Sequence, residues 1–425
     1  MGGIPCFRKA LRHRLAWPLV AALLGCEYAG WVGYQAVRNR LYDFNLYYVA
    51  ARAWREGIDV YALAEKGGKP LWEALATRYG VTHLAPPYRY PPLTAELVLP
   101  LTALTPLAAG IVWLILSAGA FIAAAWLLGR TSNQEGGPAL AGLLLAGWVP
   151  ALATLHAGQV NGLLLLALCA GLYGLRRGRE ALAGAGLAIG AMLKLVPVAL
   201  VGYLAWRGSW RALAAAVVVI LVLWASAAIP FGETGLVSYV AHLPALGEMG
   251  RVIRAAPNQS LNGLWGRFLA DWLSDEAIYR IYLLSLGALG LAVIGLLWPP
   301  GPRGATATRR EMALSVCALQ LATPYAWYHQ MVILIVPAFV LVEEILSGQA
   351  PKWWLGPLGV AFFLFDLHGV AWHAAPASWR VGLSFPCLMA LLMLGMLGWL
   401  VKRGEAPALH EGVRSARLPP REGRP

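Results

Sequence analysis

Apolar runs separated by short polar or basic segments occupy most of this 425-residue chain. Hydrophobic residues make up 59% of the sequence and charged residues only 13%, which is more apolar material than the core of one soluble domain can bury. The sequence therefore predicts an all-α polytopic membrane protein with about twelve transmembrane helices. The runs lie near residues 15–37, 107–128, 138–155, 159–175, 181–193, 195–206, 212–230, 281–298, 312–325, 330–346, 354–371 and 381–401.

Several runs are shorter than the roughly 20 residues that a perpendicular span needs, so they must lie inside a bundle or pair as short helices. Residues 181–206 lie between the arginine clusters 176–179 and 207–211, and the positive-inside rule places both clusters in the cytoplasm. The chain between them must therefore cross the membrane an even number of times. Because Pro197 removes a helix hydrogen bond, we predict a hairpin of two short helices that is broken at residues 194–197.

The distribution of basic residues predicts the remaining topology. We expect a cytoplasmic basic N-terminus at residues 1–14, a membrane domain at 15–401 with extracytoplasmic loops at 38–106 and 231–280, and a disordered, basic, cytoplasmic tail at 402–425. This arrangement suits a multi-pass protein of the plasma (inner) membrane. The net charge of +13 is dispersed between apolar segments rather than gathered in one domain, so no nucleic-acid partner is expected.

The first long loop begins with a helical pattern, which Gly57 ends. A second short helix is expected around residues 71–79, and a third, surface or re-entrant, helix at 93–104. We therefore predict that this loop carries short helices along the membrane surface. Four residues share one face of the first helix: Asp43, Tyr47, Ala50 and Trp54.

Asp43 is the best candidate for a catalytic group. It opens the first loop at the membrane surface, where a carboxylate can accept a proton from a substrate that approaches from outside. Aspartate is also favoured at helix N-caps, where its side chain accepts hydrogen bonds from backbone N–H groups. General base and N-cap are therefore alternative, and compatible, roles for Asp43.

Lys194 lies within an apolar run, whereas the other lysines lie in polar segments. Burying an ammonium group is costly unless an anion accompanies it, so an intramembrane cation indicates a function. A lipid phosphate would suit this position. The alternative is that Lys194 only snorkels from the hairpin to the membrane interface.

Two further outer turns combine polar and aromatic residues. In residues 323–330, His329 could donate a hydrogen bond to phosphate or assist proton transfer, although a histidine among Trp and Tyr is also typical of an interfacial belt. In residues 156–161, Gln159 and Asn161 could bind sugar hydroxyls, with helix capping as an equal alternative.

The second long loop ends in a polar segment, residues 258–263, which Arg267 follows. This segment is a candidate for substrate contact, and Asn258-Gln259-Ser260 is formally an N-glycosylation sequon. The sequence has no Walker loop, dinucleotide glycine motif, His-Glu-x-x-His or Asp-x-Asp motif, and its five cysteines are scattered. We therefore expect no metal or cofactor, and a sugar donor that is not a nucleotide sugar.

Several blocks of sequence together carry a resemblance to a known family. They are Asp43-Phe44 with Tyr48-Val49-Ala50-Ala51-Arg52-Ala53, Gly57-Ile58-Asp59-Val60-Tyr61, Tyr90-Pro91-Pro92, Gly158-Gln159-Val160-Asn161, Lys194 to Pro197, Asn258-Gln259-Ser260 and Thr323-Pro324-Tyr325-Ala326-Trp327. In this order they resemble glycosyltransferase family 87, membrane enzymes of the GT-C type. That family includes polyprenyl-phosphomannose-dependent mannosyltransferases and arabinofuranosyltransferases.

The resemblance implies a GT-C fold and a sugar, mannose or arabinofuranose-like, that moves with inversion from a polyprenyl-phosphate donor to an envelope glycolipid or glycan acceptor. It makes Asp43 the base, with His329 as a second catalytic candidate. A polyprenyl phosphate can leave without protonation if cations meet its charge, so one base and a cationic phosphate site suffice. The expected phosphate ligands are Lys194, His329 and Arg267, and the expected sugar or acceptor ligands are Tyr47, Tyr90, Gln159, Asn161, Asn258, Gln259 and Trp327.

Two positions depart from the family pattern. Thr323-Pro324 stands where the family often has Ser-Pro, and Tyr328-His329-Gln330 where it often has paired histidines, which leaves the role of His329 open. A lipid-linked sugar transporter or flippase is the alternative function, motivated by Lys194. The chain shows no convincing internal repeat, which weighs against that alternative because many transporter folds are built from repeats. A noncatalytic subunit of an envelope complex is a third interpretation.

Overall fold

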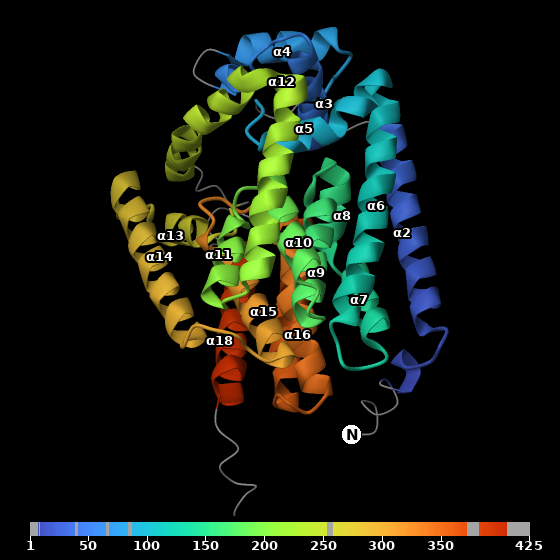
Figure 1. The fold of residues 1–425 in the computed structure, drawn as a ribbon, viewed down its shortest axis with the longest axis vertical. Coiled ribbons are helices and arrows are strands. Elements are labelled where there is room, and N and C mark those ends of the chain that lie inside the picture. Colours follow the sequence, from blue (N-terminus) through green and yellow to red (C-terminus); the bar gives the residue numbers. More distant parts are fainter. Residues whose placement is uncertain are drawn as a thin grey trace, which may run out of the picture.

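Every secondary-structure element that the computed structural model describes is a helix (Figure 1). The description covers residue 7 and residues 9–38, 41–64, 68–83, 87–252, 258–371 and 382–405, so most of the predicted tail at 402–425 lies outside it. The elements are α2 (Ala16–Arg38), α3 (Tyr42–Arg55), η1 (Ala62–Ala64), α4 (Lys69–Arg78), α5 (Pro92–Val98), η2 (Leu99–Ala103), α6 (Pro106–Arg130), α7 (Gly137–Ala146), α8 (Val149–Ala157), α9 (Asn161–Arg176), α10 (Glu180–Leu193), α11 (Val198–Trp206), α12 (Trp210–Val252), α13 (Leu261–Leu269), α14 (Asp275–Leu297), α15 (Ala305–Ala322), η3 (Tyr328–Leu334), α16 (Ile335–Leu346), η4 (Lys352–Trp354), α17 (Leu355–Ala371), η5 (Gly382–Ser384) and α18 (Phe385–Glu405).

Five of the described helical segments are long and apolar enough to cross a membrane. α7 and α8 together would make a sixth span, bent by 63° at the break between them. The prediction of an all-helical membrane protein is confirmed, whereas the count of about twelve crossings stays a prediction. The five segments are Pro106–Arg130, Trp210–Glu233, Asp275–Leu297, Tyr328–Leu346 and Gly382–Gly404.

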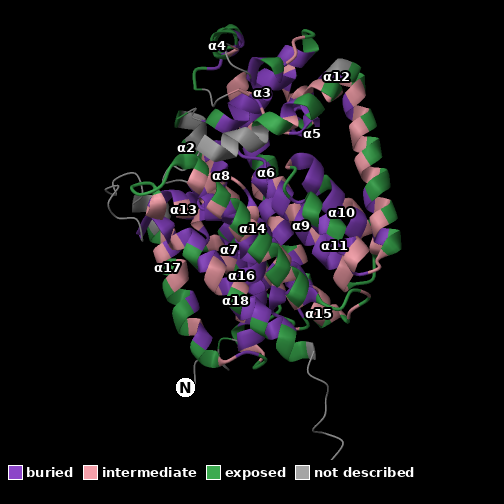
Figure 2. Cartoon of the chain, turned by 90° about the vertical axis from the view of Figure 1, so that its left-hand side faces the viewer, coloured by how far each residue is buried: buried purple, intermediate pink, exposed green. Residues whose placement is uncertain are grey.

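Apolar runs that are too short to span alone form short helices, as the sequence predicts. The chain breaks between α10 and α11 at Lys194 to Pro197, where the hairpin break is expected. α9 and α10 pack closely because glycines meet between them: a Cβ at Gly186 would lie 2.5 Å from the backbone nitrogen of Gly171. Figure 2 shows buried residues concentrated in these central helices.

α12 and α14 are much less buried than the central helices. Only 17% of the apolar window of α12 and 11% of that of α14 is buried, which leaves these surfaces to lipid. α12 bends at Gly232, whose φ of 67° is left-handed. Its second half lies over the end of the bundle that carries α3, α4 and α5 (Figure 1). The predicted loop at 231–280 is therefore mostly helical where it is described.

Short helices close one end of the bundle, as predicted for the first loop. α3 ends just before Gly57, which has a φ of 75°, and α4, α5 and η2 follow. The Arg55 guanidinium donates to Thr102 Oγ1 at 2.9 Å, and the Tyr48 hydroxyl donates to the Leu104 carbonyl at 2.8 Å. These bonds fasten α3 to η2. We call α3, α4, α5 and η2 the cap.

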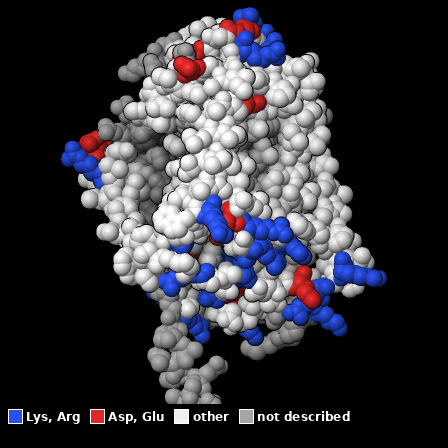
Figure 3. All heavy atoms as spheres, viewed as in Figure 1, with Lys and Arg blue, Asp and Glu red and all other residues white. Residues whose placement is uncertain are grey.

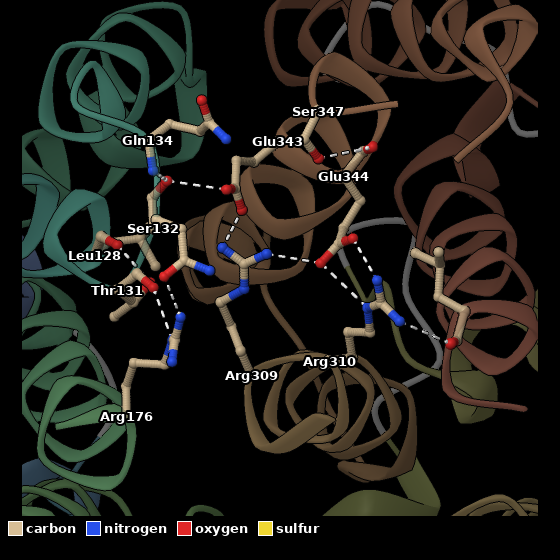
Figure 4. A network of polar contacts seen from close by, with 12 residues as sticks. Leu128, Thr131, Ser132, Gln134, Arg176, Arg309, Arg310, Glu343, Glu344 and Ser347 are labelled. Carbon is tan, nitrogen blue, oxygen red and sulfur yellow. Dashed lines mark hydrogen bonds and ion pairs between the residues drawn. The ribbon is translucent and has the colours of Figure 1, made fainter. Parts of the chain in front are cut away.

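Arginines and glutamates pair at the end of the bundle opposite the cap (Figure 4). Arg310 donates to both carboxylate oxygens of Glu344, at 3.1 and 2.6 Å, while Arg309 pairs with Glu344 at 2.6 Å and also with Glu343. Ser132, after α6, donates to Glu343 at 2.9 Å. This cluster joins α15, α16 and the turn after α6. Lys and Arg side chains gather toward the same end (Figure 3), which we call the basic end.

Replacing Glu344 by Gln should destabilise the fold, because it leaves the buried Arg309 and Arg310 guanidiniums without their shared carboxylate. Removing one partner of a buried ion pair costs about 3–5 kcal/mol. Thermal unfolding of the purified protein in detergent micelles measures this loss. Glu276→Gln is the matched control, since its pair with Arg280 is exposed and such pairs contribute below about 1 kcal/mol. Equal melting temperatures for the two variants would contradict the expectation.

Candidate active site

Asp43 lies in the first turn of α3, on the side that faces the bundle. The N-cap of α3 is Leu41, and no side chain caps the helix. The alternative prediction that Asp43 is the N-cap is therefore wrong by two residues, because the helix begins at Tyr42 and Asp43 is already inside it. The Asp43 side chain is buried, and its Oδ2 has no hydrogen-bond partner among the described residues.

Gln159 connects Asp43 to two tyrosines, one on α3 and one in the segment before α5. The Tyr47 hydroxyl donates to Gln159 Oε1 at 2.9 Å, and Gln159 Nε2 donates to the Tyr90 hydroxyl at 3.0 Å. Gln159 also hydrogen-bonds the Asp43 carboxylate. The turn that presents Gln159 needs glycine at position 158, where φ is 70° and a Cβ would lie 2.6 Å from the Cβ of Phe44.

Lys194 reaches the same site from the break between α10 and α11. Its Nζ lies 5.5 Å from the centre of the Tyr90 ring, and this nitrogen is buried with no hydrogen-bond partner among the described residues. Thr94 of α5 donates to the Leu193 carbonyl at 3.1 Å, which fastens the cap to this turn. The Lys194 charge acts on both Asp43 and His329. The ammonium therefore points toward the other candidate groups rather than away from them.

The carboxyl group of Asp43 is tuned by opposing effects. Burial raises its pKa to about 6, while the hydrogen bond from Gln159 and the charge of Lys194 act in the opposite direction. A carboxyl with a pKa near neutrality is a stronger base than an exposed aspartate and is still mostly ionised at pH 7. The environment of Asp43 therefore suits proton abstraction.

His329 lies at the start of η3 and is held through its backbone. Its carbonyl accepts hydrogen bonds from Thr154 Oγ1 at 3.1 Å and from Asn161 Nδ2 at 3.0 Å. The imidazole Nε2 is buried and has no hydrogen-bond partner in the described part of the chain. Asn161, which the sequence suggests as a sugar ligand, thus uses its side-chain nitrogen to hold the His329 backbone, while its Oδ1 is buried with no hydrogen-bond partner among the described residues.

Asn258 and Gln259, which the sequence suggests as sugar or acceptor ligands, make hydrogen bonds to the segment before η3. Asn258 Oδ1 accepts a bond from the Ala326 amide at 2.9 Å, its Nδ2 donates to the Pro324 carbonyl at 3.1 Å, and the Gln259 amide donates to the Ala326 carbonyl at 2.7 Å. The segment at Asn258 and Gln259 is therefore hydrogen-bonded to the segment at Pro324 to Ala326, although the two are far apart in the sequence. The Asn258 side chain is 0% exposed, so the formal sequon offers no accessible site for a glycan.

Arg267 and Trp327 complete the predicted set. Arg267 donates to the Asn258 carbonyl at 2.6 Å and to Ser384 Oγ at 2.8 Å, so it fastens α13 to η5. Neither bond involves Asp43 or Lys194, and the role of Arg267 as a phosphate ligand stays a prediction. Trp327 is half-buried and directly precedes η3.

Arg89 and Tyr325 lie near the site, although the sequence pattern assigns a role to neither. The charge of Arg89 acts on the Tyr325 hydroxyl, and Tyr325 in turn acts on Tyr90. Arg89 also donates to the Ala64 carbonyl at 3.3 Å. The signal that could have revealed Arg89 is a cation between two tyrosines, Tyr88 and Tyr90, directly before a pair of prolines. Among the described residues, no group of three or more His, Cys, Asp or Glu side chains could hold a metal ion.

A comparison with protein families identifies the chain. The model of glycosyltransferase family 87 matches residues 88–324, which is more than half of the sequence. Asp43 and Tyr47 precede the matched stretch, and Trp327 and His329 follow it. No curated protein matches the chain. The matched stretch contains most of the segments that meet around Gln159 and Lys194. The chain belongs to glycosyltransferase family 87.

Proposed function

We propose that this membrane glycosyltransferase moves a sugar from a polyprenyl-phosphate donor to a glycolipid or glycan acceptor of the cell envelope, with Asp43 as the general base. One observation carries the proposal. Asp43 and Lys194 interact electrostatically, and each keeps a buried atom without a hydrogen-bond partner in the described structure. Asp43 can accept the proton of an acceptor hydroxyl, and Lys194 can bind the phosphate of a donor.

The reaction needs one proton acceptor. Asp43 Oδ2 takes the proton of the acceptor hydroxyl, and the hydroxyl oxygen forms a bond to the anomeric carbon from the side opposite the phosphate. The bond between that carbon and the phosphate oxygen breaks, and the phosphate leaves with the electron pair. The anomeric configuration inverts because the new bond forms on the opposite face. A phosphate that leaves as an anion needs cations rather than a second carboxylic acid.

Lys194 is the proposed phosphate ligand with the strongest support. Its ammonium is buried beside the Tyr90 ring without an acceptor, and an anion would compensate the cost of burying it. Arg89 is a second cation for the same phosphate, and His329 Nε2 is a candidate for a hydrogen bond to it or for proton transfer. Arg267 is a weaker candidate than the sequence suggests, because its contacts hold α13 in place.

Tyr47, Tyr90 and Gln159 form the wall against which the proposed sugar or acceptor would lie, since they surround Asp43. Trp327 stays a candidate for stacking on a sugar. Asn161, Asn258 and Gln259 would act by holding the backbone of η3 and of the segment before it. Mannose and arabinofuranose both remain compatible with these groups.

The proposed topology puts the cap outside the plasma (inner) membrane and both termini in the cytoplasm. It is supported by the gathering of Lys and Arg at the basic end (Figure 3), because cytoplasmic loops carry an excess of these residues. The lipid-linked acceptor and the polyprenyl donor would then meet Asp43 at the outer surface of the bilayer.

Asp43→Asn should lower sugar transfer about 10²- to 10⁴-fold, the range that general base catalysis contributes. The measurement is transfer from a polyprenyl-phosphate sugar in proteoliposomes that hold equal amounts of folded protein. Asp271→Asn, at an exposed aspartate after α13, is the matched control and should keep full activity. Unchanged turnover in Asp43→Asn would refute the role of the base, and movement of labelled donor lipid without any product would favour the flippase.

The pH dependence of kcat/KM should report Asp43. A protonated Asp43 cannot accept a proton, so kcat/KM falls as the pH drops through about 6. Lys194→Gln removes a cation that lowers this pKa, so the acid limb moves to higher pH. The same change should reduce kcat/KM at its pH optimum about 10- to 100-fold, because a hydrogen bond to a charged group contributes ~1.5–3 kcal/mol. Lys352→Gln, at an exposed lysine, is the control, and an acid limb that does not move in Lys194→Gln would count against the pairing.

A further inference from the structure

The second half of α12, residues 233–252, lies over the cap (Figure 1), and we call it the arm. The arm begins after Gly232, whose φ of 67° bends the helix. A Cβ at Gly232 would meet nothing within 4 Å, so the space around the bend is open. A bend in open space can change its angle with little repacking, which is what the hinge of a moving segment requires.

A hydrogen bond and aromatic contacts join the arm to the turn between α3 and η1. Ser238 Oγ donates to Asp59 Oδ2 at 2.5 Å, and Asp59 Oδ1 accepts a hydrogen bond from the Tyr61 amide at 2.9 Å. The rings of Tyr239 and His242 lie 5.3 and 5.9 Å from the Tyr61 ring. These contacts hold one face of the arm against Tyr61.

Tyr61 connects the arm to the candidate active site. Its hydroxyl donates to the Tyr90 carbonyl at 2.8 Å, and the Tyr90 ring lies beside Lys194. Tyr239 also interacts electrostatically with Tyr325, which in turn acts on Tyr90. By either route a single tyrosine lies between Tyr239 and Tyr90. The arm therefore brings Tyr239 to the border of the candidate active site.

The hydroxyl group of Tyr239 is buried on the inner face of the arm. Tyr239 is 3% exposed, and its hydroxyl has no hydrogen-bond partner among the described residues. Burial, and to a lesser extent Tyr325, raises the pKa of Tyr239 above its usual value, so the hydroxyl keeps its proton at neutral pH and can donate a hydrogen bond. A buried donor without an acceptor destabilises a fold, and a ligand with an acceptor oxygen would offset that cost.

We propose that Tyr239 is a sugar-binding residue of the candidate active site, and that its hydroxyl donates a hydrogen bond to a sugar oxygen when the arm closes over the substrate. A sugar offers several acceptor oxygens and apolar C–H faces, which suit a hydroxyl among aromatic rings. The substrate reaches the hydroxyl when the arm turns away from the cap at Gly232. The inference rests on the proposed function, and the sugars of donor and acceptor present the same chemistry to Tyr239.

Binding to the full chain in lipid nanodiscs, measured by isothermal titration calorimetry, tests this assignment. The probes are a polyprenyl-phosphate sugar (mannose or arabinofuranose), octyl mannoside as a simple acceptor sugar, and polyprenyl phosphate without a sugar. Tyr239→Phe should weaken binding of the sugar donor or of octyl mannoside about 3- to 10-fold, as expected when a hydrogen bond between uncharged groups is lost. The probe that is affected identifies which sugar the hydroxyl contacts. Binding of polyprenyl phosphate should not change.

Tyr28→Phe is the matched control, because Tyr28 also carries a buried hydroxyl without a hydrogen-bond partner in the described part of the chain. Its ring, on α2, packs against Phe121 of α6 at 5.8 Å, so this change should leave the affinity for every probe intact. Neither change should lower the melting temperature, since each removes an unpaired hydroxyl.

Unchanged binding of both sugar probes in Tyr239→Phe, an equal loss in Tyr28→Phe, or a loss that extends to polyprenyl phosphate would overturn the assignment. These measurements need no turnover, so they are separate from the test of the base. If Asp43→Asn keeps full activity while Tyr239→Phe weakens sugar binding, the base is misassigned and the sugar ligand stands. The reverse pair of results removes only Tyr239 from the site.

Discussion

The hydrogen bonds of Gln159 hold the cap to the bundle at the point where chemistry is proposed. They join Asp43 and Tyr47, which are both on α3, to Tyr90, which reaches the site from the segment before α5. At membrane depth a buried polar group that is not paired costs free energy, so the turns that interrupt short helices must satisfy one another. The same requirement explains why the segments at Asn258 and Pro324 hydrogen-bond each other.

Buried charged side chains are paired differently at the two ends of the molecule. At the basic end, the buried Glu311 carboxylate pairs with Arg207 at 2.7 Å, and Glu344 is shared by two arginines. Near the cap, Asp43 and Lys194 interact but each retains an atom without a hydrogen-bond partner among the described residues. A buried charge that is held by fixed partners stabilises one structure, whereas a buried charge with spare hydrogen-bonding capacity is prepared for a ligand.

Local features were predictable from the sequence and long-range contacts were not. Pro197 and Gly57 act on their own backbone, so the broken hairpin and the end of α3 followed from residue type alone. The partners of Asn258 and Arg267 lie in segments that are distant in the sequence: Pro324 is 66 residues from Asn258, and Ser384 is 117 residues from Arg267. No spacing rule predicts such pairs. The prediction that Asp43 is the N-cap was wrong because α3 begins at Tyr42, and helix boundaries are the least reliable part of a pattern-based prediction.

The position of Lys194 also suggests an order for the proposed reaction. In the free enzyme its charge lowers the pKa of Asp43, which weakens the base. A donor phosphate bound to Lys194 would offset that charge and add its own, so the pKa of Asp43 should rise and the base should strengthen once the donor is in place. The pH profile of kcat reports the enzyme–substrate complex and that of kcat/KM the free enzyme, so the acid limb of kcat should lie at the higher pH. Coincident acid limbs would mean that the phosphate and Asp43 are not coupled, and that Lys194 serves another purpose.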